Sequence, residues 1–285
     1  MKRQIFLLGI GLITILSLDS CTHYYYAPTS HNIPVFKEKN EVRASVGLIK
    51  GDEVTGCDIQ AAYAMTKESA ILANASIIDP GQAGGHGQLY ELGAGYFKPI
   101  PSSNTFLNHR FVFEVYGICG IGNAKNYYGN TGFNYNEYPD YYISANLLKG
   151  YIQPSIAFST NFIDVIASGK IGVLHSFGVK RHMPDSVYNA QGQNNSDGQR
   201  TVVDDVRILN ANKASFFFEP AVTLRLGYKY VKFQFQAGWS VIASDFQKVS
   251  SSPVFNFGIT VDVAKRFRLK NDRPAKEKWK DLFFD

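Results

Sequence analysis

The chain has 285 residues, of which 45% are hydrophobic and 19% charged, and its formal net charge is +5 at neutral pH. This length suits one barrel rather than two domains, and so small an excess of positive charge excludes a dedicated nucleic-acid-binding protein. High counts of Tyr (17), Phe (21) and Gly (25), with only 3 Cys, are typical of a β-protein rich in aromatic residues and turns.

The N-terminus has the pattern of a targeting segment. Lys2 and Arg3 precede an apolar run over 5–18, which is too short to be a transmembrane helix. The sequence LDSC at 18–21 resembles a bacterial lipobox, which implies diacylglyceryl transfer to Cys21 and cleavage before it; Asp19 departs from the small or apolar residue usual there. We therefore expect a lipoprotein signal peptide over 1–20. The alternative is ordinary secretion with Cys21 as a spare thiol.

Residues 21–40 are expected to form an irregular periplasmic leader between the anchor and the first strand. They contain YYYAP at 24–28 and NIP at 32–34. Proline cannot donate a backbone hydrogen bond, so it is excluded from the interior of a sheet.

The rest of the chain alternates apolar and polar residues with the period of a β-strand, most clearly near the C-terminal end. There Phe255, Phe257 and Ile259 share one face, while Asn256 and Thr260 share the other. Strands of about ten residues that are apolar outside and polar inside are the repeating unit of a membrane-spanning barrel. The expected strands cover 41–49, 56–65, 70–78, 88–97, 110–122, 141–160, 162–179, 214–228, 230–243 and 254–267.

The lengths of the connections agree with this interpretation. Of the four connections expected to be short, 66–69, 160–161 and 229 are short and 98–109 is not, whereas 123–140 and 180–213, on the opposite side, are the two longest. Bacterial barrels place short turns in the periplasm and long loops outside. The sequence therefore predicts an all-β, antiparallel up-and-down transmembrane barrel over 41–267 with about ten strands, or eight or twelve if 141–160 is merged or split, and a charged periplasmic tail over 268–285.

The inner face of these strands collects charges of both signs at similar depth. A small barrel has a lumen that side chains can fill, and buried charges are tolerated only when they are paired. We therefore expect a structural polar network rather than a pore, made by Arg43, Asp58, Glu91, Glu114, Lys170, Glu219, Arg225, Lys232 and Asp262. Cys57 and Cys119 fall on the apolar phase and are expected to act as small hydrophobic residues.

Taken together, the lipobox-like segment, the leader and the sequence AAYAMT at 61–66 resemble Bacteroidota-type outer-membrane β-barrel lipoproteins. The resemblance covers most of the mature chain and implies an outer-membrane location and a barrel architecture. It carries over no activity and no catalytic positions.

The sequence offers little for catalysis or metal binding. The histidines and cysteines show no zinc or calcium spacing, so no metal or cofactor is predicted. Catalytic candidates are His86, His109, the pair His175 and Ser176, and His182 with Asp185. Adjacent strand residues point to opposite faces, which argues against the His175 and Ser176 pair and against an enzyme.

We expect a non-enzymatic, lipid-anchored outer-membrane barrel that is a structural or accessory component of an envelope complex. Its expected partners are membrane lipid and other envelope proteins, with no nucleic acid. Loops rich in Asn, Gly and Tyr at 123–130 and 180–213 provide surface for a protein or glycan partner, or are plain solvated loops. Two alternatives stay open: a narrow channel or solute- or glycan-binding protein, which requires an unfilled lumen, and a lipid-tethered periplasmic barrel, which the outward aromatic residues disfavour.

Overall fold

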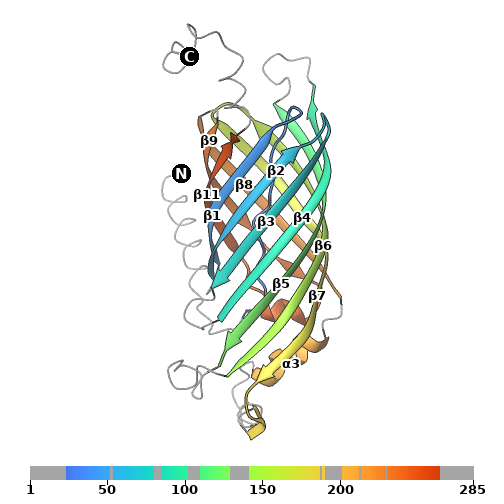
Figure 1. Cartoon of the computed structure of the whole chain (residues 1–285), viewed down its shortest axis with the longest axis vertical. Coiled ribbons are helices and arrows are strands. Elements are labelled where there is room, and N and C mark those ends of the chain that lie inside the picture. Colours follow the sequence, from blue (N-terminus) through green and yellow to red (C-terminus); the bar gives the residue numbers. More distant parts are fainter. Residues whose placement is uncertain are drawn as a thin grey trace, which may run out of the picture.

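Ten antiparallel strands close into a barrel in the computed structural model, which describes residues 24–51, 54–79, 85–101, 110–128, 141–186, 188–189, 201–211, 214–228 and 230–263 (Figure 1). The wall strands are β1 (Val42–Gly51), β2 (Thr55–Ala64), β3 (Ser69–Asp79), β4 (Gly85–Ile100), β5 (Phe111–Tyr127), β6 (Tyr142–Ser159), β7 (Ile163–His182), β8 (Ser215–Tyr228), β9 (Val231–Gly238) and β11 (Val254–Asp262). The short strand β10 (Val241–Ile242) pairs only with β8.

Each wall strand pairs with its neighbours in sequence, and the barrel is closed where β11 pairs with both β1 and β9. This up-and-down order confirms the predicted fold class. The segment predicted at 141–160 is a single strand, β6, so the alternatives of eight and twelve strands are wrong.

The segment predicted as one strand at 230–243 is broken. Strand β9 ends at Gly238, and β10 resumes pairing with β8 at Val241. Pro220 lies in β8 at the break, where Trp239 donates its backbone N–H to the Pro220 carbonyl. Proline has no N–H to return, so the ladder loses a bond at that position.

The two ends of the barrel differ. At one, which we call the turn end, lie the connections 65–68, 101–110, 160–162 and 229–230, the start of β1 and the finish of β11. At the other, the loop end, lie the connections 52–54, 80–84, 128–141, 183–214 and 239–253. The predicted asymmetry between short and long connections is therefore present. The turn end is uppermost in Figure 1.

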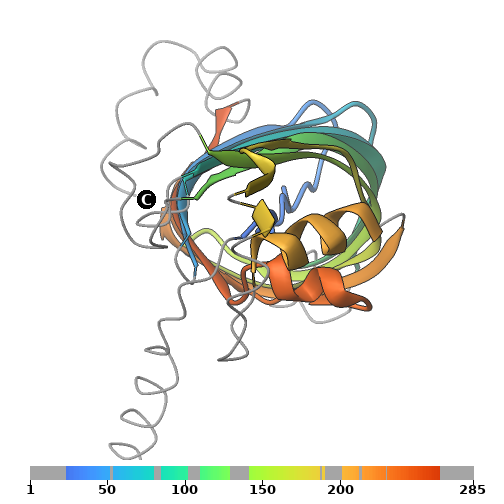
Figure 2. The ribbon, with the colours of Figure 1, turned by 90° about the horizontal axis from the view of Figure 1, so that it is seen from below.

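Two helical segments cover the loop end: α3 (Val202–Ala211) and the 3₁₀ helix η1 (Asp245–Val249), seen across the opening in Figure 2. The sequence analysis treats 180–213 as a loop and misses α3. Thr201 and Asp204 form reciprocal side-chain to backbone hydrogen bonds at its start, a capping box that the sequence spacing could have revealed. In the described residues, neither this helix nor another has the length and apolarity needed to cross a membrane.

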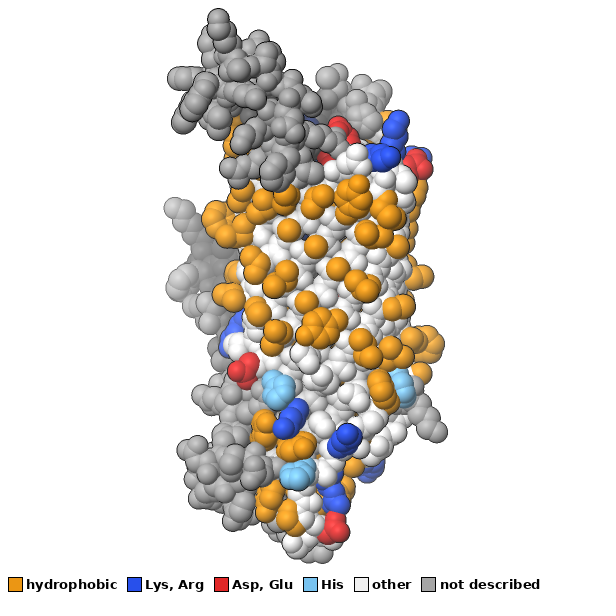
Figure 3. All heavy atoms as spheres, in the orientation of Figure 1, with side chains coloured by type: hydrophobic (Ala, Val, Ile, Leu, Met, Phe, Trp, Pro, Cys, Tyr) orange, Lys and Arg blue, Asp and Glu red, His pale blue; other side chains and the backbone are white. Residues whose placement is uncertain are grey.

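The outer face of the barrel carries a belt of exposed apolar side chains (Figure 3). Along β5 the outward apolar positions run from Phe111 to Ile121, after which Asn123 and Lys125 face outward. That length matches what a tilted strand needs to cross the hydrocarbon of a bilayer. Cys57 and Cys119 are free thiols on this face.

Candidate functional site

The lumen is occupied by the leader segment, residues 24–36, which lies inside the ring of strands (Figure 2) and has contacts at both ends of the barrel. At the loop end, the Tyr24 carbonyl accepts a hydrogen bond from Asn126, and Tyr25 N–H donates to Val249. At the turn end, the Phe36 ring packs against Phe97 with 5.6 Å between ring centroids. The sequence analysis places this segment in the periplasm, which is wrong for 24–36 because residues 25–36 are all buried inside the barrel.

The two prolines of the leader segment suit this position. Pro28 and Pro34 flank the polar run 29–32 and hold the chain away from helical conformations. Neither has a backbone N–H, so two fewer donors need a partner inside the lumen. Proline excludes the segment from the wall, as predicted, and favours it as an extended filler.

A buried ion pair between wall strands contacts the leader segment near its start, at Tyr26. Lys149 Nζ on β6 lies 3.0 Å from Glu219 Oε2 on β8, and both side chains are fully buried. Lys149 also donates to Tyr26 Oη at 2.5 Å, and Tyr26 in turn donates to Glu219 at 2.5 Å. The leader thus supplies a neutral hydroxyl that bridges two charged groups of the wall.

A second contact with charged wall residues lies further along the leader segment, at Thr29. Thr29 Oγ1 donates to both carboxylate oxygens of Glu91 at 3.1 Å and accepts from Lys170 Nζ at 2.7 Å. Lys170 also donates to the Thr29 carbonyl at 2.9 Å. Gly120 faces Glu91 across the β4–β5 ladder, and a Cβ there would lie 2.8 Å from Glu91 Cγ, so glycine leaves room for the carboxylate.

Wall amides hold the middle of the leader segment by its backbone. Gln236 accepts from His31 N–H at 2.7 Å and donates to the His31 carbonyl at 3.2 Å. Asn32 donates its side-chain amide to Asn74 at 2.7 Å, and Gln153 donates to the Asn32 carbonyl at 2.8 Å. The bonds from Gln236 and Gln153 satisfy backbone groups of the leader segment that water would otherwise have to reach, and the bond between Asn32 and Asn74 joins two side chains.

Glu114 holds the far end. Its two carboxylate oxygens accept the successive backbone N–H groups of Val35 and Phe36, each at 3.2 Å. Val35 has φ 55°, a left-handed conformation that is strained for a β-branched residue. Consecutive N–H groups that point to the same side favour an anionic partner, and the Glu114 carboxylate accepts both of them.

The structure places all the predicted lumen residues on the inner face and sorts them into two groups. Glu91, Glu114, Lys170 and Glu219 contact the leader segment, as described above. The other five have partners within the wall: Arg43 with Asp262 at 3.7 Å, Lys232 with Asp164 at 2.6 Å, Arg225 with Gln234 at 2.7 Å, and Asp58 with Asn256 at 2.7 Å. Asp58 also interacts with the Ser30 side chain of the leader segment.

The sequence analysis missed two charged residues of the lumen, Lys149 and Asp164. Lys149 shares the phase of Gln153 on β6, and Asp164 shares the phase of Lys170 on β7. Extending the same alternation would have found both. The predicted lipidation site, Cys21, lies outside the described residues.

The loop end is closed by a second polar chain. Tyr25 Oη lies 2.6 Å from Tyr128 Oη, and Tyr128 donates to Asp205 of α3 at 2.6 Å. Burial raises the pKa of Tyr128 well above its ordinary value, and the neighbouring Tyr25 and Asp205 add to the shift. Tyr128 is therefore a neutral donor at neutral pH, and it ties α3 to the entrance of the leader segment.

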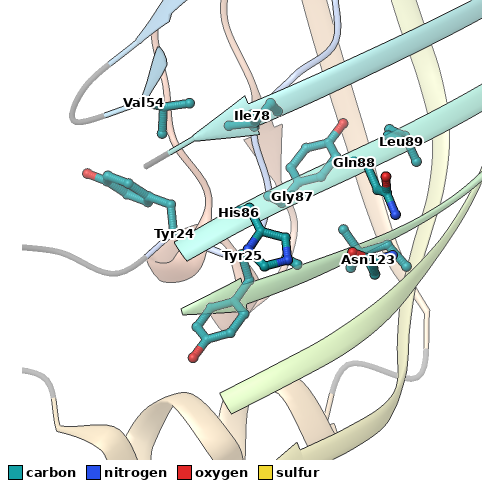
Figure 4. Close-up of a pocket in the computed structure, with 13 residues that line it drawn as sticks. Tyr24, Tyr25, Val54, Ile78, His86, Gly87, Gln88, Leu89 and Asn123 are labelled. Atoms are coloured by element: carbon teal, nitrogen blue, oxygen red, sulfur yellow. The ribbon is translucent and has the colours of Figure 1, made fainter. Parts of the chain in front are cut away.

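A shallow hollow remains at this end between the leader segment and strands β3 to β5 (Figure 4). Its cavity volume is about 30 Å³, which is room for only one or two water molecules. Tyr24, Tyr25, Val54, His86 and Asn123 line it, so its surface is largely apolar. Among the described residues, those that line it include one histidine and no Ser, Thr, Cys, Asp or Glu.

The catalytic candidates do not assemble into a site. His175 stacks on Phe177 on the outer face, whereas Ser176 points inward and donates to the Leu209 carbonyl. His182 stacks on Tyr142, and Asp185 pairs with Arg181. His109 lies outside the described residues. Within the described part of the chain, no cluster of His, Cys, Asp and Glu could hold a metal ion.

The fold and its filled lumen define a closed antiparallel β-barrel plugged by its own N-terminal segment. No protein-family model and no curated protein matches the sequence. Among solved structures, the outer membrane protease OmpT from Escherichia coli is similar over 79% of this chain and 94% of that chain, with 8% identity and a TM-score of 0.36. A likeness this weak carries no argument about activity.

Proposed function

We propose that this protein is a plugged outer-membrane β-barrel, anchored additionally by a lipid on Cys21, that serves as a non-enzymatic structural or accessory component of the cell envelope. The observation that carries the proposal is the leader segment, which fills the lumen and is bonded to the wall along its length. A barrel closed in this way offers its partners an outer surface and a loop end.

The outer belt supports a membrane-spanning position. Leu92 and Phe216 are each 71% exposed and Phe233 is 69% exposed, and similar residues surround the barrel. A contiguous apolar surface of this extent would aggregate in water, whereas a bilayer covers it. This disfavours the lipid-tethered periplasmic barrel.

The filled lumen disfavours the narrow channel. Residues 25–36 are buried, and the charged groups that would line a pore instead contact them or one another. We therefore expect no continuous water-filled path through the barrel while the leader segment is in place.

The burial of a His–Ser contact in the lumen supports a non-enzymatic role. His31 Nδ1 lies 2.8 Å from Ser168 Oγ, a pairing that could activate a hydroxyl on an open surface. Both side chains face the filled lumen, where His31 is 2% exposed. His31 itself belongs to the leader segment, so displacing the leader to admit a substrate would separate the two side chains.

Conductance in planar bilayers tests the closed lumen. The purified full-length protein should insert without producing steady ion current, because the leader segment blocks the pore. Heat-modifiable migration of the same sample would establish that the barrel is folded. A steady current from folded protein would overturn the closed-barrel proposal in favour of the channel.

Fractionation tests the membrane-spanning position separately from the lipid. A Cys21→Ala variant should stay in the outer-membrane fraction and keep its heat-modifiable migration, because the barrel itself spans the bilayer. Cys57→Ala, which removes a thiol from the outer face, is the matched control. Release of Cys21→Ala into the soluble fraction would mean that the barrel is only tethered. Incorporation of an alkyne-labelled fatty acid into the wild type, but not into Cys21→Ala, would support lipidation.

A further inference from the structure

We infer that the mature N-terminus emerges on the cell-surface side of the membrane, so that a diacylglyceryl group on Cys21 would insert in the outer leaflet. This inference rests on the proposed membrane-spanning barrel. It places Cys21 on the cell-surface side of the membrane, whereas the sequence alone suggests a leader in the periplasm.

The direction of the leader segment carries the argument. Tyr24 is bonded at the loop end, through Asn126 at the end of β5, while Asn40 donates to the Ala64 carbonyl at the turn end. The chain therefore runs from the loop end to the turn end before β1 begins. Everything that precedes Tyr24 starts from the loop end.

The short distance along the chain to Cys21 makes that conclusion firm. Three residues of fully extended chain span at most about 11 Å, so Cys21 must stay within that distance of Tyr24 whatever conformation the chain adopts. The apolar band of an outer-membrane barrel is about 25 Å tall. A lipid on Cys21 therefore cannot reach the leaflet at the turn end around the outside of the barrel.

The lumen offers no return path either. Residues 25–36 occupy it. The Lys149–Glu219 pair of the wall is hydrogen-bonded to Tyr26 of the leader segment inside the lumen. A second passage of chain, still less an acyl chain, has no room there.

The barrel's orientation follows from its connections. The turn end has the tight turns 65–68, 160–162 and 229–230 and the longer connection 101–110, and the first wall strand begins and the last one ends there. The loop end has the short connections 52–54 and 80–84 together with the three longest connections, 128–141, 183–214 and 239–253, and the helical cover. Outer-membrane barrels place short turns in the periplasm, so the loop end, with Tyr24, faces the exterior.

The test is cysteine labelling of intact cells with a membrane-impermeant maleimide, in a Cys57→Ala, Cys119→Ala background. His23→Cys reports the N-terminus, Ser186→Cys reports the loop end and Lys67→Cys reports the turn end. Ser186 and Lys67 are both exposed. The same background without an introduced cysteine measures any labelling of Cys21 itself.

We expect His23→Cys to label on intact cells to the same extent as Ser186→Cys, and Lys67→Cys to label only after the outer membrane is permeabilised. Labelling of His23→Cys only after permeabilisation, with Ser186→Cys accessible throughout, would overturn the inference while leaving the barrel intact.

Other outcomes separate the inference from the proposed function. If Lys67→Cys labels on intact cells and Ser186→Cys and His23→Cys do not, the barrel is reversed and the surface assignment falls, although the N-terminus still shares the side of the loop end. If all three label without permeabilisation in a soluble fraction, the membrane-spanning proposal itself fails. If His23→Cys does not assemble, judged by heat-modifiable migration, Tyr24→Cys provides the same readout from a described residue at the loop end.

Discussion

The two faces of the same wall strands are built on different principles. On the outer face a residue needs only to be apolar, because lipid accepts any apolar side chain. On the inner face each charged group has a specific partner, as Lys149 does with Glu219 and Tyr26. Leu148 and Lys149 are consecutive in β6, yet one is exposed on the belt and the other is fully buried. The outer face therefore specifies only an apolar environment for the barrel, whereas the inner face specifies one arrangement of the chain.

The largest loss of stability is expected when one buried cation is removed from the inner face. Lys149→Met should lower the free energy of unfolding by about 3–5 kcal/mol, because Glu219 would be left buried without its counter-charge. The measurement is the urea midpoint in detergent micelles. Leu148→Met, one residue away on the outer face, should leave that midpoint almost unchanged. Equal effects from the two variants would mean that the faces do not differ as described.

A charge placed on the outer face should destabilise the barrel in lipid. Ile152 lies near the middle of the belt on β6, opposite Gly117 of β5. Ile152→Lys should lower the free energy of unfolding in lipid by about 2–4 kcal/mol, whereas Leu148→Lys, toward the loop end, should cost about 0–1 kcal/mol. Refolding in liposomes at graded urea concentrations measures both. The absence of a dependence on depth would contradict a membrane-spanning belt.

The contact at Glu114 tests whether the leader segment is held by charge. Glu114→Gln keeps the shape but replaces one carboxylate oxygen with an amide group, so we expect a loss of about 1.5–3 kcal/mol. Limited proteolysis should also cut the leader segment faster in this variant. Phe113→Leu, the adjacent outward residue, serves as the control. Unchanged protection of the leader segment would show that the backbone bonds to Glu114 are dispensable.

The smallest effect is expected at the exposed pair on η1. The hydrogen bond from Lys248 and its positive charge lower the pKa of Asp245. Because the folded-state pKa is lowered, any stabilisation is present at neutral pH and is lost as the pH falls through that pKa. Asp245→Asn should therefore leave the urea midpoint unchanged at neutral pH within error, since solvent screens an exposed pair. A shift as large as that of Glu114→Gln would contradict this ranking.

Alternation was enough to predict the wall, because the two environments of a barrel strand impose a period of two on every segment. It located all ten strands and gave the inward phase of Glu91, Lys170 and Glu219 correctly. It failed where the chain departs from that period. The break after Gly238 depends on Pro220 in the neighbouring strand, and α3 follows a helical period inside a segment treated as a loop.

The position of the leader segment could not be predicted in this way. The run from Tyr24 to Phe36 has no period, and its partners are spread over nearly every wall strand. The inward charges indicated that the lumen is polar and paired. They could not show that Glu91 and Glu114 pair with the leader segment while Arg43 and Asp262 pair with each other, because both arrangements satisfy the same rule.

The leader segment also makes the barrel a protein of very non-local contacts. Tyr26 meets Glu219 across 193 residues of sequence, and His31 meets Gln236 across 205. Such contacts form only after their loop-closure entropy has been overcome, which slows folding. The leader segment therefore completes its contacts only after the last strands have formed, so we expect the barrel to close around it. We therefore expect insertion of the leader and sealing of the wall between β1 and β11 to occur together and late, and a chain truncated before β8 would lack Glu219 and Gln236, two of the partners of the leader segment.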